Sequence, residues 1–192
     1  MKLYKLCTDA DKGLVLGTEI EYFYNHFVGK PMLPNWRPPA IEVQSKSKPV
    51  RDFVAWAHCA PVVSEKARAC LAPALGHLVE FLPLIQVKSK QLYAVNVLNV
   101  IDCLDIAHSR IMFDPAEPGR IVDVIRFVFE ASRLRSDPVI FKVPEDTGCA
   151  FISQTVVDII VANQLTGSLL LNPSANPFAV VLPQSPDVWR PV

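Results

Sequence analysis

Two aspartates are the residues best suited to chemistry, because Asp102 and Asp105 stand three positions apart, just after a predicted strand that ends at Val100. On a helix this spacing would bring both carboxylates to one face, where they could bind a metal ion or perform acid–base catalysis. At the start of a short helix or in a turn, the same side chains would instead accept hydrogen bonds from backbone amides. A third interpretation is that they contact a partner. The spacing leaves all three interpretations open.

Other residue types that support catalysis occur without the spacing that catalysis needs. The four histidines form no H-x-x-x-H or H-E-x-x-H pair, and His58 beside Cys59 would need two more ligands to bind zinc. The seven glycines build no phosphate-binding loop. Ser64 and Ser153 lack the flanking glycines of a hydrolase nucleophile elbow. We therefore expect no catalytic residue, cofactor site or metal site, and the two aspartates remain the alternative.

Composition predicts a single domain over residues 1–192. The chain has 192 residues, 51% of them hydrophobic, which suffices for a sizeable core. Its 19 basic and 19 acidic side chains disfavour direct nucleic-acid binding. The sequence contains no apolar run of membrane-spanning length and no signal peptide, so we expect no membrane contact. Five scattered cysteines without a C-x-x-C pair are typical of free thiols in the cytoplasm, the predicted location.

The zero net charge is an average of two unlike halves. Residues 1–100 carry 12 basic and 8 acidic side chains, whereas residues 101–192 carry 7 basic and 11 acidic ones. This asymmetry permits a charged interface that steers a partner of opposite charge.

The first fifty residues differ in composition from the rest. They are rich in aromatic residues and proline, with no helical period. We expect a short strand over 3–7 followed by irregular chain, and a polar loop over 44–49. Residues 1–50 are therefore interpreted as an irregular N-terminal part.

A unit of strand, serine, helix, glycine and strand occurs twice. Its two copies comprise 61–63, Ser64, a helix, Gly76 and 78–82, then 150–152, Ser153, a helix, Gly167 and 168–171. The serine would cap the first helical turn and the glycine would close the last one. Pro73 is expected to end or kink the first helix near Ala72, because proline lacks an amide hydrogen.

The chain between the two copies favours strands over 92–98, 121–129 and 139–143. A helix is the rival for 121–129, because this run is apolar throughout. The predicted fold is α+β, with a mixed sheet, the duplicated strand–Ser–helix–strand unit and few helices. We expect the two copies to contribute neighbouring strands to one sheet.

From about residue 51 to 171 the chain resembles a family of bacterial immunity proteins of polymorphic toxin systems. The resemblance rests on several blocks in the expected order, namely 61–66, 79–83, 93–105, 140–143, the second strand–Ser–helix from residue 150, and 165–167. Lys142 stands where the family pattern has arginine, and Pro73 interrupts an otherwise continuous helix. On this basis residues 51–172 are interpreted as an immunity-like core.

The resemblance implies a protein that is not an enzyme and that binds and neutralises a cognate toxin domain in the cytoplasm; the toxins of such systems are often nucleases. The alternative is a small hydrolase or metal-dependent enzyme that uses Asp102 and Asp105, and a third hypothesis is an adaptor module. Buried aromatic anchors are common in inhibitory interfaces. The candidate partner contacts are Trp56, Asp102 and Asp105, with further aromatic candidates at Trp36, Trp189 and 22–24.

Overall fold

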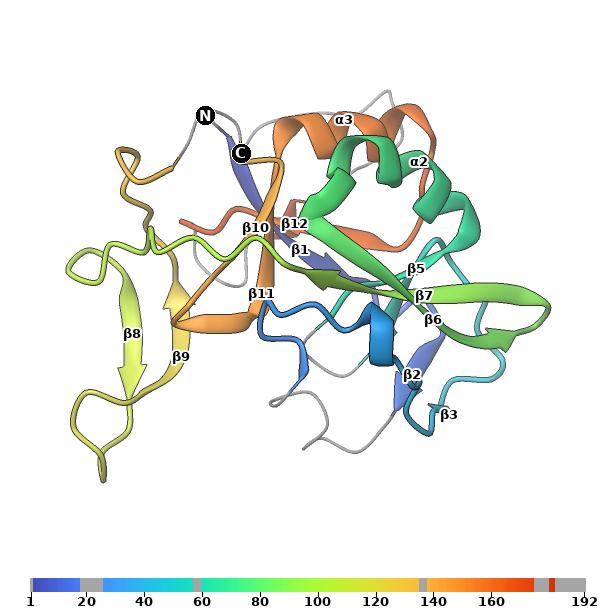
Figure 1. Cartoon of the computed structure of the whole chain (residues 1–192), viewed down its shortest axis with the longest axis horizontal. Helices are drawn as coiled ribbons and strands as arrows, with labels where there is room; N and C mark the ends of the chain where they lie inside the picture. Colours follow the sequence, from blue (N-terminus) through green and yellow to red (C-terminus); the bar gives the residue numbers. More distant parts are fainter. Residues whose placement is uncertain (1, 18–25, 57–59, 135–137, 175–179, 182–192) are drawn as a thin grey trace.

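Within the described residues, two β-sheets and two α-helices form the body of the molecule, and a two-stranded ribbon projects from one end (Figure 1). The structure is a computed structural model that describes residues 2–17, 26–56, 60–134, 138–174 and 180–181. The predicted α+β class with few helices is confirmed.

One sheet has five strands, and the N-terminal strand lies at its centre. The order is β10 (Ile140–Val143), β11 (Asp146–Ser153), β1 (Leu3–Thr8), β12 (Ser168–Leu171) and β13 (Val180–Val181). All neighbours are antiparallel. Leu3 lies opposite Ser153 on one side of β1, and Thr8 lies opposite Ser168 on the other. Strand β1 therefore joins strands from the far end of the sequence.

The other sheet has six strands. Their order is β3 (Glu42–Val43), β2 (Val15–Gly17), β4 (Phe53–Trp56), β5 (Val62–Ser64), β7 (Lys90–Val97) and β6 (Val79–Val87). Strands β2 and β4 are parallel and the other pairs are antiparallel, which confirms a mixed sheet. Residues 1–50, expected to hold one strand, thus contribute β1, β2 and β3.

The duplicated unit is present, but its copies belong to different sheets. The first copy is β5, α2 (Glu65–Leu75), the short 3-10 helix η2 (Gly76–Leu78) and β6; the second is β11, α3 (Gln154–Ala162) and β12. In each copy a strand from elsewhere, β7 or β1, lies between the unit's own strands and runs antiparallel to both. The expectation of one shared sheet is therefore wrong, because each unit builds its own sheet around an inserted strand.

The serine cap predicted for both helices of the duplicated unit forms in the first copy but not in the second. The Ser64 hydroxyl caps α2 by accepting a hydrogen bond from the Ala67 amide at 3.2 Å. The buried Ser153 hydroxyl makes no such bond, so the predicted cap of α3 is wrong. Pro73 was expected to end or kink this helix near Ala72, and helix α2 does not end there but continues to Leu75. Pro73 lies in the last turn, where a missing amide costs one hydrogen bond, and the buried Leu75 holds that turn in place.

The remaining predicted strands are confirmed with shifted ends. The segment predicted as 121–129 forms β9 (Ile121–Arg126), and the rival helix is wrong. Strand β9 pairs with β8 (Arg110–Phe113), which the sequence did not indicate, and together they form the projecting ribbon (Figure 1). We call residues 110–126 the β8–β9 arm.

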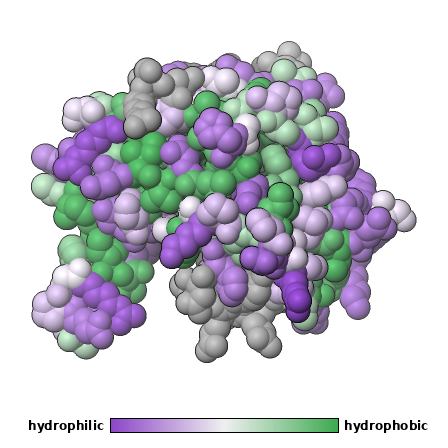
Figure 2. Space-filling model, in the orientation of Figure 1, coloured by the Kyte–Doolittle hydropathy of each residue, from purple (hydrophilic) through white to green (hydrophobic). Residues whose placement is uncertain are grey.

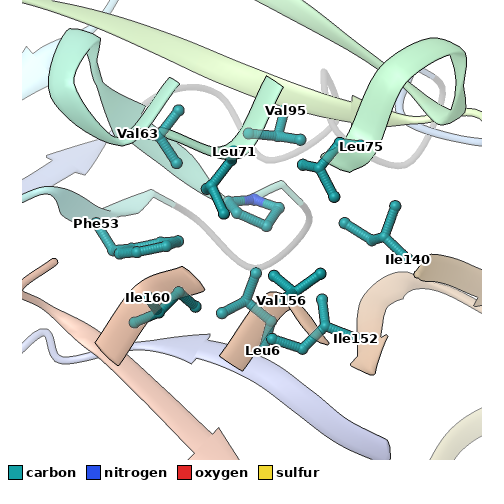
Figure 3. Close-up of a pocket in the computed structure, with 11 residues that line it drawn as sticks. Leu6, Phe53, Val63, Leu71, Leu75, Val95, Ile140, Ile152, Val156 and Ile160 are labelled. Atoms are coloured by element: carbon teal, nitrogen blue, oxygen red, sulfur yellow. The ribbon is translucent and has the colours of Figure 1, made fainter. Parts of the chain in front are cut away.

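The main core lies between the two helices and both sheets. Helices α2 and α3 contact each other, and their buried faces meet apolar side chains from β1, β4, β5, β7, β10 and β11. A cavity of only about 10 Å³ remains here, and apolar side chains from both sheets and both helices line it (Figure 3). This space is no larger than a water molecule and offers no polar group to a ligand.

Candidate partner-binding surface

Asp102 lies on the surface and takes part in an ion-pair cluster. Its segment between β7 and β8 is irregular rather than helical, so the expected helical face shared with Asp105 does not form. The carboxylate is 71% exposed, and its Oδ1 atom lies 3.3 Å from Nη1 of Arg133. Arg133 also pairs with Glu130 at 2.8 Å. Asp102 is therefore accessible to a partner.

Asp105 closes the turn that leads into β8, as the structural interpretation predicted. Its carboxylate accepts a hydrogen bond from the His108 amide at 3.1 Å, and its Oδ2 atom lies 2.7 Å from the His108 ring. The His108 ring lowers the pKa of Asp105. The Asp105 amide donates to the Val128 carbonyl at 2.8 Å, which ties the turn to the chain after β9.

The two aspartates thus have separate partners. In the described part of the chain, no group of three or more His, Cys, Asp and Glu side chains is placed to hold a metal ion. Cys103, between the aspartates, is buried, and burial raises the pKa of its thiol to about 12. It is therefore protonated at neutral pH and a poor nucleophile.

Two asparagines of the same block, which the sequence did not single out, connect the sheets and the N-terminal segment. The Asn96 side chain is buried and donates to the Lys30 carbonyl at 2.8 Å and to Glu80 at 2.9 Å. The Asn99 side chain donates to the Ile140 carbonyl at 2.8 Å, which links the end of β7 to β10 in the other sheet. In the sequence, the only sign of these two contacts is that Asn96 and Asn99 are amide side chains within an apolar run.

Glu80 and Lys142 hold residues 27–32, part of the N-terminal segment, against the body of the molecule. Glu80 accepts the Met32 amide at 2.7 Å, just before the 3-10 helix η1 (Leu33–Asn35). Lys142 is fully buried on β10, and its ammonium donates to the Phe27 carbonyl at 2.9 Å. The cation at this position of the family pattern therefore supports the fold.

Trp56 is part of the core. Its side chain belongs to the apolar cluster on the six-stranded sheet, is 5% exposed and packs edge to face on Phe27 at 5.8 Å between ring centroids. It presents little surface to a partner. Trp36 also packs edge to face on Phe27 and donates its indole hydrogen to the Pro83 carbonyl at 2.7 Å. The other aromatic candidates, 22–24 and Trp189, lie outside the described residues, as do His58 and Cys59.

The β8–β9 arm carries apolar side chains that the body does not cover. Met112, Phe113 and Val122 are 45%, 46% and 54% exposed. Ile111 and Val124, opposite each other in the arm, pack instead on the apolar cluster of the body. Ile121, next to the connecting loop, packs on the same cluster. The side chains of the arm therefore divide into a set that packs on the body and an exposed set, Met112, Phe113 and Val122, which we call the outer part of the arm; Figure 2 shows hydrophobic surface on the arm above a hydrophilic tip. This outer part is the candidate partner-binding surface.

The model of the immunity protein family (Imm11) matches residues 16–171. The chain belongs to this family. The match begins well before residue 51, where the resemblance was expected to begin, and thus includes β2, η1 and the segment that Glu80 and Lys142 hold. No curated protein matches the chain.

Membership of the Imm11 family supports an immunity function and implies a toxin partner. The β8–β9 arm and the aspartate-bearing segment both lie inside the matched range. In the part of the chain that the structure describes, none of the helices has the length and apolar character needed to cross a membrane.

Proposed function

We propose that this Imm11 family member binds the toxin domain of its own system and neutralises it by occupying a surface that the toxin needs. The observation that carries the proposal is the apolar outer part of the β8–β9 arm, because large apolar side chains left in solvent on a projecting ribbon are typical of interaction sites. Asp102 remains a candidate contact because its carboxylate is exposed, whereas Asp105 acts in the turn.

A nuclease is the toxin class we propose. Residues 101–192 carry 11 acidic and 7 basic side chains, and the excess lies outside the arm, because residues 110–126 carry three of each sign. An acidic surface attracts the basic surface that a nucleic-acid-binding cleft requires. A toxin that attacks nucleic acid has to be stopped in the cytoplasm, where we place this protein.

The test is to purify the protein together with the toxin domain encoded beside it. We expect a stable complex on gel filtration and survival of cells that express both. An unrelated toxin domain serves as the control and should neither bind nor be neutralised. Absence of a complex at micromolar concentrations, together with absence of protection, would contradict the proposal.

A titration separates binding from catalysis. Neutralisation by binding saturates when protein and toxin are equimolar, whereas an enzyme that uses Asp102 and Asp105 would protect at far lower amounts. The variant Asp102→Asn/Asp105→Asn should therefore still neutralise the toxin. Protection at a small fraction of equimolar protein, lost in this variant, would favour the enzymatic alternative. Digestion of DNA and RNA by the purified toxin tests the proposed nuclease class.

A further inference from the structure

We infer that the body of the molecule is a tandem repeat of one folding unit, and that the two repeats exchange their first strands. The first repeat comprises residues 3–87 and the second comprises residues 90–171. Each begins with a strand, β1 or β7, that completes the sheet of the other repeat. The inference extends the duplicated unit to both sheets except their edge strands β3 and β13, and it does not depend on the proposed function.

The order and direction of the strands are the first argument. The six-stranded sheet contains the series β2, β4, β5, β7 and β6, and the five-stranded sheet contains the series β10, β11, β1 and β12. Val100 adds to the second series through a parallel bridge from Lys142 on β10, just as β2 is parallel to β4. Every other neighbouring pair in the two series is antiparallel. The two series therefore match strand by strand, with Val100 in the place of β2.

The register of the pairing is the second argument. Counted from Ser64 and Ser153, the pairs of one sheet recur at the same offsets in the other. The corresponding pairs are Ser64↔Leu92 with Ser153↔Leu3, Val63↔Tyr93 with Ile152↔Tyr4, Phe53↔Val63 with Ile140↔Ile152, Val79↔Val97 with Ser168↔Thr8, and Val15↔Ala55 with Val100↔Lys142. A slip of one residue would turn every side chain to the other face of its sheet. Agreement across all of these pairings therefore identifies equivalent positions.

Each exchanged strand also contacts the helix of the other repeat through an equivalent tyrosine. Tyr4 on β1 donates from its hydroxyl to Oε1 of Gln154, the first residue of α3, at 2.6 Å. Tyr93 on β7 lies beside Glu65, the first residue of α2, and hydrogen bonds from Arg68 and Tyr93 lower the pKa of the Glu65 carboxyl to about 2. Both helices therefore begin against a strand that belongs to the other repeat.

The two repeats differ in the chain inserted before β4 and before β10. In the first repeat, the described residues of this insertion include η1 and β3, and their apolar side chains pack on the cluster of the six-stranded sheet. In the second repeat, the insertion includes the β8–β9 arm, which packs on the cluster of the five-stranded sheet (Figure 1). The arm thus lies outside the repeated unit.

The exchange makes each repeat incomplete without the other. Strand β7 lies between β5 and β6 of the first repeat, and β1 lies between β11 and β12 of the second. Helices α2 and α3 also pack on each other in the main core. This is the arrangement of a strand-swapped dimer, joined here in one chain. We therefore expect the two repeats to unfold together in one cooperative transition.

A strand transplant in the full chain tests the equivalence of β1 and β7. Residues 3–8 receive the sequence of the matching residues 92–97. The substitutions are Lys5→Ala, Leu6→Val, Cys7→Asn and Thr8→Val. Because each position receives the residue of its counterpart, the protein should stay folded, with Tm lowered by no more than about 10 °C.

The matched control is a transplant shifted by one residue, in which residues 3–8 receive the sequence of 93–98. It replaces Tyr4 by alanine and places an asparagine at Leu6, which packs against the main core. The shifted variant should lose its cooperative thermal transition. If the matched variant also loses it, or if both variants melt alike, the positions of β1 and β7 are not equivalent and the inference is overturned.

Cleavage of the full chain between the repeats tests the exchange itself. Lys88 and Ser89 form an exposed turn with φ values of 49° and 63°, where a protease site can be inserted. After cleavage, the two pieces should elute together on gel filtration and unfold in one transition. The same site inserted beside Gly119, inside the second repeat, is the control for cleavage. Pieces that separate, or that unfold in two transitions, would overturn the inference. None of these outcomes bears on toxin binding, so the proposed function is tested separately.

Discussion

The body and the β8–β9 arm use their apolar residues differently. In the body, Phe127, Phe141 and Phe151 are almost completely buried, and Phe151 contacts Phe127 edge to face and Phe141 in a tilted arrangement. In the arm, Met112 and Phe113 remain about half exposed. The outer residues of the arm therefore contribute little to folding, so stability and partner binding should respond to separate substitutions.

The largest effect is expected for Phe151→Ala. Phe151 lies at the centre of the aromatic cluster, fully buried against three other phenylalanines. Truncation leaves a cavity, so the free energy of unfolding should fall by about 3–5 kcal/mol. Phe113→Ala, the matched change in the arm, should cost less than about 1 kcal/mol because its ring is already half in water. Urea titrations of both variants measure the difference, and similar losses would remove the distinction between body and arm.

Two glycines provide the second comparison, because they have nearly the same positive φ in different surroundings. Gly167 in the body has a φ of 93° and Gly119 at the arm tip has a φ of 91°. A Cβ atom on Gly167 would clash with the Phe53 carbonyl oxygen and would lie 2.9 Å from the Cβ of Arg51, whereas one on Gly119 would meet nothing within 4 Å.

Gly167→Ala should therefore combine backbone strain with a steric clash and destabilise the protein by about 2–4 kcal/mol. Gly119→Ala should destabilise the protein only through the strain of a positive φ at alanine, by about 1 kcal/mol. Thermal denaturation of the two variants side by side measures the gap. Equal melting temperatures would show that the backbone conformation alone, and not the packing of the body, sets the cost.

A third prediction concerns the body at low pH. Asp52 joins the two copies of the unit: its carboxylate accepts hydrogen bonds from the Ser64 hydroxyl at 2.9 Å and from the Thr166 amide and hydroxyl at 3.0 Å each. Burial opposes ionisation, but these bonds and the charge of Lys66 outweigh it and hold the pKa of Asp52 below its ordinary value.

Since the folded pKa is lowered, the ionised Asp52 stabilises the protein above its unfolded pKa of about 4, and this contribution is lost as the pH falls through the folded value. Asp52→Asn should cost about 1–3 kcal/mol at neutral pH, because it leaves donors facing an amide. The variant should also lose less stability than the wild type between about pH 5 and pH 2. Urea titrations across this pH range measure the free energy of unfolding of wild type and variant. The control is Asp102→Asn, which changes an exposed carboxylate. If the free energy of unfolding fell with pH in parallel for wild type and Asp52→Asn, the stabilising role assigned to the ionised Asp52 would be contradicted.

Local patterns predicted the local structure of the chain well. The strand, serine and glycine of each unit are close together in the sequence, so they are sufficient to indicate a helix between two strands. The ends of the helix are less well predicted, because α3 ends at Ala162 and Gly167, expected to close its last turn, lies beyond it. The partition into two sheets depends on β1 and β7, which insert between strands that the pattern had made neighbours. Pairing of Leu3 with Ser153 joins positions 150 residues apart, and no local period encodes such a contact.

The candidate site was predicted only in part for the same reason. The turn interpretation of Asp105 was available because an aspartate three residues before His108 can accept its amide. Trp56 was interpreted as a possible contact, but its burial depends on Phe27, far away in the sequence. The exposure of Met112 could not be predicted either, because an apolar residue in a strand is usually buried, and only the projection of the ribbon leaves it in water.

The smallest effect is expected at the tip of the arm, for Arg120→Gln. The ion pairs of Arg120 with Asp114 and Glu117 are exposed, and such pairs contribute little because water screens them. The free energy of unfolding should change by less than about 0.5 kcal/mol. The variant makes the tip more acidic, so the proposed nuclease, with the basic surface that nucleic-acid binding requires, should associate about twofold faster at low salt. Stopped-flow association measures this rate. A slower rate with unchanged stability would show that Arg120 itself contacts the toxin, and the tip would then face an acidic rather than a basic group.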